Sequence, residues 1–79
     1  MRITYYAAAA DAAGTTTTSL DDGDLTAAQL VARLGGEDAK LADVLSRCSL
    51  LVDGSPVREE SELIPAGARV DVLPPFAGG

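Results

Sequence analysis

Two adjacent prolines, Pro74 and Pro75, place the strongest limit on how this chain can fold. Proline has no backbone N–H and a fixed φ, so a strand in the middle of a sheet cannot continue through a proline pair. The preceding residues 69–73 alternate as "RVDVL", which is typical of a strand with both valines on one face and Asp71 and Leu73 on the other. We therefore expect the last strand to end near Leu73 and the chain to leave the sheet there.

The length and cysteine content indicate one small domain that folds without disulfides. At 79 residues the chain lies near the lower end of what folds alone, and Cys48 is its single cysteine. A lone thiol suits a reducing compartment, so we expect the cytoplasm. The opening "MRITYYAAAADAAG" has some features of a secretory signal, but Asp11 interrupts its apolar part. No stretch approaches the roughly 20 apolar residues of a membrane span.

The net charge of −6 argues against two classes of partner. The acidic side chains number 12 against 6 basic ones, and the basic ones form no cluster. Such a surface repels nucleic-acid backbones and anionic membranes, so we expect neither as a partner. A basic protein is the natural counterpart, and the alternative is that the charge only keeps the chain in solution.

The N-terminal part predicts a strand, a helical turn and a second strand. Residues 2–7 are β-branched and aromatic, which predicts a strand with Ile3 and Tyr5 on one face. The alanine-rich stretch 7–14 is expected to form a short helical turn that ends at its glycine. Residues 15–19, "TTTTS", predict a strand near an edge of the sheet, with a linker as the alternative.

Two helices are predicted in the middle of the chain. Thr26 followed by Gln29 forms the pattern of a capping box, and the glycine pair 35–36 should end this helix. The second helix, 38–47, has one apolar face: Leu41, Val44, Leu45 and Cys48. Cys48 therefore reads as a small core residue and not as a nucleophile.

The remaining pattern is compatible with an α+β fold of the β-grasp type. "SLLVDGSPV" gives a strand, a turn at Asp53-Gly54 and a returning strand that Pro56 restricts to an edge. A Pro-x-Gly turn at 65–67 leads into the last strand. The element order is compatible with a mixed sheet packed against helices, in which the first and last strands lie side by side. Residues 1–74 would form the domain, and 75–79 a flexible tail.

The chain lacks most of the residues with which an enzyme would catalyse a reaction without a partner protein. The chain has no histidine, so it holds no Ser-His-Asp or Cys-His pair and no imidazole metal ligand. Neighbouring carboxylates at 21–22 and 59–60 are typical of solvated turns. We expect no bound metal or cofactor, and no catalysis by the chain alone.

The segment after the last strand could instead present a reactive group. If extended, 74–79 reaches about 20 Å, and without Cβ atoms Gly78 and Gly79 can enter a narrow channel. A partner enzyme that binds ATP could join the carboxylate to AMP, and a sulfur donor could then displace AMP to leave a thiocarboxylate. The alternative is a frayed end without a role.

The terminus "LPPFAGG" resembles the "PP-x-x-GG" end of the MoaD/ThiS-type sulfur-carrier proteins, and most of all the small subunit of molybdopterin synthase. The resemblance extends over "ITYYAAAADAAG", "LTAAQLVARL", "LLVDGSPV" and "LIPAGARVDV". It implies the ubiquitin-like β-grasp fold. It also implies that a ubiquitin-activating-like adenylyltransferase uses ATP to adenylate Gly79, and that a sulfur donor protein supplies the thiocarboxylate sulfur. The tail, Pro74, Pro75, Phe76, Ala77 and Gly78, would enter the large subunit of molybdopterin synthase, which would hold the catalytic residues in a heterotetramer.

The resemblance also implies a docking face around the base of the tail. Its expected members are Tyr6, Leu73, Pro56 and Phe76, although Tyr6 and Leu73 could instead pack locally. The family often has leucine, arginine and glutamate where this chain has Ala9, Ala10 and Asp11, and a smaller residue at Phe76. These departures bear on partner specificity more than on the carrier role.

Other functions fit the same pattern. The carrier could serve thiamine or cysteine synthesis. The chain could be a ubiquitin-like modifier whose Gly79 forms isopeptide bonds to lysines, or a β-grasp interaction module whose tail has no role.

Overall fold

The centre of the structure is a five-stranded mixed sheet in which the first and last strands are neighbours. A computed structural model describes residues 1–75. The strands β1 (Arg2–Tyr5), β2 (Thr17–Ser19), β4 (Ser49–Val52), β5 (Ser55–Pro56) and β7 (Arg69–Leu73) lie in the order β2-β1-β7-β4-β5. β1 pairs with β7 in parallel, and the other pairs are antiparallel. The predictions of adjacent terminal strands and of edge positions for β2 and β5 are confirmed.

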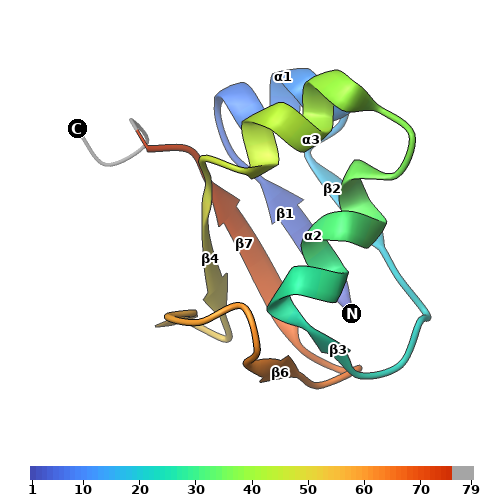
Figure 1. The fold of residues 1–79 in the computed structure, drawn as a ribbon, viewed down its shortest axis with the longest axis vertical. Helices are drawn as coiled ribbons and strands as arrows, with labels where there is room; N and C mark the ends of the chain where they lie inside the picture. The colour runs from blue at the N-terminus through green and yellow to red at the C-terminus, as the bar shows by residue number, and fades with distance from the viewer. Residues whose placement is uncertain (76–79) are drawn as a thin grey trace.

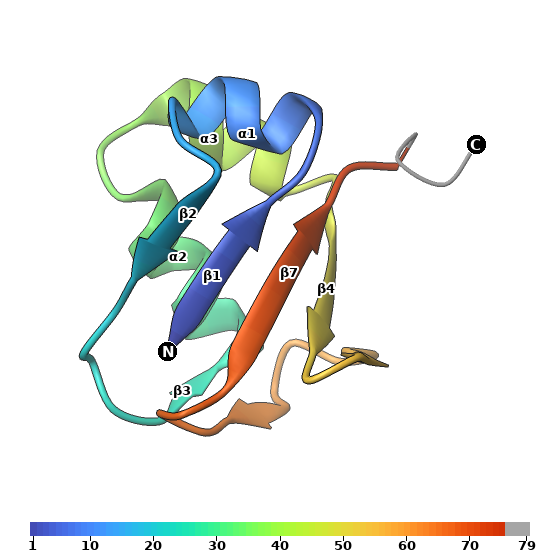
Figure 2. The ribbon, with the colours of Figure 1, turned by 180° about the vertical axis from the view of Figure 1, so that it is seen from behind.

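Helices cover one side of this sheet. The helices α2 (Ala27–Gly35) and α3 (Ala39–Leu45) lie over one face, and α1 (Ala8–Ala13) covers the end at which β1 finishes (Figures 1 and 2). The core between the layers contains Ile3 and Tyr5 from β1, Val70 and Val72 from β7, and Leu30 from α2. The strand faces predicted from alternation are therefore confirmed, and the fold is the expected β-grasp.

The local signals around the helices are also confirmed. The backbone N–H of Gln29 donates to Thr26 Oγ1 at 3.1 Å, and the N–H of Thr26 donates back to Gln29 Oε1 at 2.9 Å. Gly35 is the last residue of α2 and is buried against α3. A Cβ there would lie 3.1 Å from the Ala42 Cβ, so glycine also permits the close approach of the two helices. α1 ends at Gly14, which adopts the left-handed conformation.

A second, smaller sheet was not expected from the sequence. The strands β3 (Leu25–Thr26) and β6 (Leu63–Ile64) pair antiparallel, with Leu25 opposite Ile64. The N–H of Ala27 donates to the Glu62 carbonyl at 2.9 Å, so the first turn of α2 is tied to this segment. The small sheet thereby joins the start of α2 to the long connection between β5 and β7.

Removing the capping hydroxyl tests how much the first turn of α2 contributes to stability. Thr26→Ala leaves the Gln29 N–H without its side-chain acceptor, so the free energy of unfolding should fall by about 1 kcal/mol. Thr26→Ser keeps the hydroxyl and should lose much less. Urea unfolding followed by circular dichroism measures both, and equal stability of the Ala and Ser variants would contradict the role of the cap.

Candidate functional site

The face of the sheet opposite the helices carries apolar side chains that do not belong to the core. Leu51 on β4 and Leu73 on β7 are both half-buried, and neither packs against the core cluster. Alternation places them on the same face as Asp71, because their neighbours Leu50 and Val72 point into the core. Figure 2 views the molecule from this side, with the helices behind the strands.

Tyr6 extends this apolar surface at the end of β1. Its backbone N–H donates to the Val72 carbonyl at 3.1 Å, which continues the parallel register of Tyr5 with Val72 and brings Tyr6 beside Leu73. Tyr6 is 43% exposed, whereas Tyr5 is 4% exposed and its burial raises the pKa of its phenol. The structure therefore brings together two of the predicted docking residues, Tyr6 and Leu73, on the face away from the core.

Pro56 lies further away than the sequence suggested. It pairs with Leu51, which in turn pairs with Asp71, so β4 separates Pro56 from β7. Pro56 shares the face but stands at the sheet edge, not beside Leu73. Leu51 is the residue that sequence reasoning missed, and it is a diagonal neighbour of Leu73 across the β4–β7 pair. We call Tyr6, Leu51 and Leu73 the apolar patch.

The chain leaves the sheet next to the apolar patch. β7 ends at Leu73, as the proline pair predicts, and Pro74 is buried whereas Pro75 is exposed. The packed part of the chain thus includes Pro74. Phe76, Ala77, Gly78 and Gly79 lie outside the described residues, so their expected parts in the docking face and the tail stay predictions.

The turn that follows Tyr6 has an unusual backbone conformation. Ala7 has φ 50 and ψ −126, which is rare for a residue with a Cβ. The carbonyl of Tyr6 accepts the Ala9 N–H at 3.0 Å, and Ala9 is fully buried. Ala9, which departs from the family pattern, is therefore a core residue here, and Asp11 is exposed on α1.

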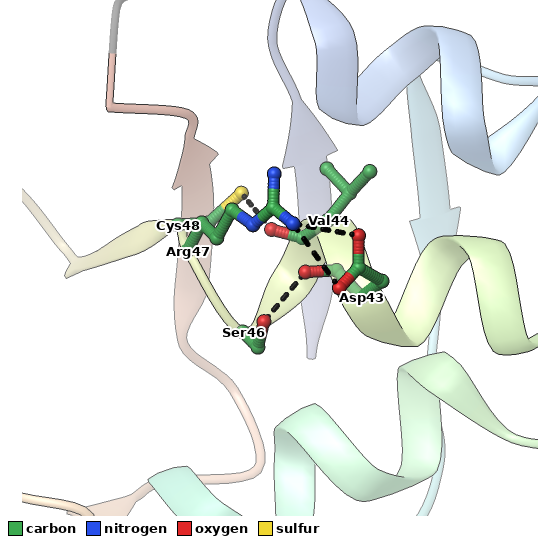
Figure 3. A network of polar contacts seen from close by, with 5 residues as sticks. All are labelled: Asp43, Val44, Ser46, Arg47 and Cys48. Atoms are coloured by element: carbon green, nitrogen blue, oxygen red, sulfur yellow. Dashed lines mark hydrogen bonds and ion pairs between the residues drawn. The ribbon is translucent and has the colours of Figure 1, made fainter.

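Cys48 is held in a way that disfavours reaction. Its Sγ–H donates to the Val44 carbonyl at 3.2 Å, at the end of α3 where Arg47 also pairs with Asp43 (Figure 3). The residue is half-buried, and burial raises the pKa of its thiol, so the thiolate is scarce near neutral pH. This environment agrees with the prediction that Cys48 packs and does not act as a nucleophile.

Within residues 1–75, no group of three or more His, Cys, Asp or Glu side chains is arranged to hold a metal ion. No helix in the same range is long and apolar enough to cross a membrane. The apolar patch lies at the end of the described chain, because Leu73 is the last residue of β7.

The parallel β1–β7 pair, the edge hairpin and the helices on one face define a small ubiquitin-like protein. The sequence matches the model of the ThiS family over residues 3–79, and the chain belongs to this family. Proteins of this kind are small carriers or modifiers and not enzymes by themselves, as we expected for this chain.

Solved structures of one archaeal protein resemble the whole fold. A crystal structure of SAMP1 from Haloferax volcanii is 27% identical, covers 100% of this chain and 98% of its own, and has a TM-score of 0.79. A second structure, of the small archaeal modifier protein 1 of H. volcanii, is 26% identical with a TM-score of 0.79 and coverages of 96% and 97%. Comparison with curated proteins gave no match.

A charge in the apolar patch tests whether this surface binds a partner. If an activating enzyme docks here, Leu73→Asp should weaken its binding by at least about tenfold, because the carboxylate would have to give up its hydration in the interface. The fold should survive, since Leu73 lies outside the core. Leu63→Asp is the matched control, because Leu63 is 63% exposed on the small sheet.

Isothermal titration calorimetry gives the two affinities, and circular dichroism checks both folds. Equal affinities of the two variants would contradict docking through the patch.

The strained backbone at Ala7 leads to a prediction about the free energy of unfolding. Glycine adopts φ 50 without a Cβ clash, so Ala7→Gly should raise the free energy of unfolding by about 1 kcal/mol. Ala8→Gly, one residue further at the start of α1, should lower it by roughly 0.5 kcal/mol. Denaturant unfolding measures both changes, and a loss of stability in Ala7→Gly would show that the turn is not strained.

Proposed function

We propose that this chain is a sulfur carrier whose C-terminal Gly79 is adenylated, converted to a thiocarboxylate and used as a sulfur donor. Within that class we favour the small subunit of molybdopterin synthase, acting in the cytoplasm. The observation that carries the proposal is the place where the chain leaves the sheet. A partly exposed apolar patch of Tyr6, Leu51 and Leu73 stands directly beside the residues that lead into the "FAGG" segment.

The arrangement suits a reaction that takes place in another protein. Segment 76–79 can span at most about 14 Å, so a partner's reacting atoms must lie close to the end of β7. A surface that docks the partner beside this point would hold the carboxylate within that distance. Because Pro74 is buried, the base of the tail is fixed to the sheet, which reduces the freedom lost on binding.

The partners supply the groups that this chain lacks. An oxygen of the Gly79 carboxylate attacks the α-phosphorus of ATP, and pyrophosphate leaves. The terminal sulfur of a persulfide on a donor protein then attacks the acyl carbon, and AMP leaves. A thiol attacks the donor's own sulfur in the resulting acyl disulfide, so that a new disulfide forms and the thiocarboxylate is released. In the large synthase subunit the tail would transfer its sulfur to the pterin precursor, with two small and two large subunits in the assembly. No residue of this chain has to act as acid, base or nucleophile other than the terminal group.

A second candidate function is protein modification. Two of the solved structures that match the chain carry the name of an archaeal modifier protein, which favours this function. The same activated carboxylate would then be attacked by a lysine amine instead of a sulfur donor. Carriers for thiamine or cysteine synthesis use the same activation and differ in the final acceptor.

Intact-mass measurement after activation distinguishes these functions. The protein is incubated with ATP, the adenylyltransferase and a sulfur donor. A carrier gains the mass difference between one sulfur and one oxygen atom, whereas a modifier appears in covalent adducts with other proteins. Absence of both products under conditions that adenylate a known substrate would contradict the proposal. Conversion of the pterin precursor by the large subunit then identifies the pathway.

The position of the terminal carboxylate provides a stringent prediction. Deletion of Gly79, or addition of one alanine after it, should reduce sulfur transfer to background, because the carboxylate is displaced by about one residue length, about 3.5 Å. Thermal unfolding should be unchanged, because the change is made five residues after Pro74, the last buried residue of the described range. Activity in either variant would contradict a reaction at the Gly79 carboxylate.

A further inference from the structure

Amines are scarce in this chain. Of the 6 basic residues, Lys40 is the single lysine and the rest are arginines: Arg2, Arg33, Arg47, Arg58 and Arg69. An arginine guanidinium stays protonated in proteins and is a poor nucleophile, whereas a lysine loses its proton far more readily. An activated carboxylate that meets this surface therefore finds one side-chain amine with which it can form a stable amide.

Lys40 is open to such an attack. It lies in the first turn of α3 and is exposed, while its neighbour Leu41 is buried in the core. Within residues 1–75, its ammonium group has no carboxylate close enough for an ion pair. The side chain can be modified without loss of a core contact or a salt bridge.

The backbone amine is less available than Lys40. The Met1 ammonium donates to the Leu20 carbonyl at 2.9 Å, and Met1 is half-buried against the core. Its reaction would require this hydrogen bond to break and the start of β1 to move. The Lys40 amine is thus more accessible to an activated carboxylate than the Met1 amine is.

The location of Lys40 leaves it accessible to the tail of a second molecule. α3 begins on the side of the molecule opposite the end of β7, as both ribbon views show (Figures 1 and 2). α3 also lies on the helical side of the sheet, so a copy attached at Lys40 leaves the apolar patch of the acceptor open.

We propose that Lys40 is a self-modification site at which the activated Gly79 of one copy is joined to a second copy. This inference rests on the activation of Gly79 proposed above. The neutral Lys40 amine attacks the carbonyl carbon of the acyl-adenylate, a C–N bond forms, and the C–O bond to AMP breaks. AMP leaves, the amine proton passes to solvent, and no oxidant or reductant is needed.

The test incubates the purified chain with ATP and the adenylyltransferase, without a sulfur donor. Wild-type protein should give a dimer and longer chains that resist denaturation and thiols. Lys40→Arg keeps the charge and removes the nucleophile, so adducts should fall to background, while ATP–pyrophosphate exchange is unchanged. Deletion of Gly79 is the control that removes the donor end.

Trypsin digestion provides a specific signature of the link. Cleavage after Arg69 leaves segment 70–79 attached to the acceptor, and the modified Lys40 is not cut. The expected product is peptide 34–47, uncleaved at Lys40 and joined to segment 70–79 through an amide bond at that lysine. Tandem mass spectrometry identifies it.

The possible outcomes separate this inference from the proposed function. Pyrophosphate exchange without any Lys40-linked product, in protein that forms the thiocarboxylate once a sulfur donor is added, would overturn the self-modification site and leave the carrier role intact. Adducts that persist in Lys40→Arg, or that map to Met1, would also overturn it. Loss of exchange in wild-type protein would reject the activation of Gly79, and with it both proposals.

Discussion

The parallel pairing of β1 with β7 is the interaction on which the rest of this structure depends. It joins the two most distant parts of the chain, from Arg2 opposite Arg69 to Tyr5 opposite Val72. The same pair supplies Ile3, Tyr5, Val70 and Val72 to the core on one face. On the other face it brings Tyr6 and Leu73 together beside the exit of the chain. One strand pair thus sets both the stability of the domain and the position of the candidate site.

Much of this fold could be predicted because the deciding interactions are local. The prolines after Leu73 end β7, and the capping box of Thr26 and Gln29 begins α2. Both effects depend only on residues that are close together in the sequence. The Asp53-Gly54 turn has φ of 49 and 85, the left-handed values that Asp-Gly sequences favour in tight hairpins. In each case a few neighbouring residues decide the structure.

The parts that could not be predicted depend on register and on very short strands. The face of Leu51 follows from its alternation with Leu50, but its place beside β7 depends on a pairing that no local signal encodes. This is why Pro56 was expected too near Leu73. Two-residue strands such as β3 and β6 have no readable alternation, and Leu63 at 63% exposure resembles a loop residue. The face of the candidate site was therefore predictable, and its full membership was not.

The geometry of the terminal strands has a mechanical consequence. β1 starts near the N-terminus and β7 ends where the tail begins, and the strands run parallel. A pull that separates the two ends of the chain therefore acts along both strands in opposite senses. The hydrogen bonds between the strands lie across this direction, including Arg2 N–H to Ala68 O at 3.0 Å and Tyr6 N–H to Val72 O at 3.1 Å. They are loaded together in shear and cannot be broken one at a time, so the domain should resist traction on its tail when a partner draws that segment into a narrow channel.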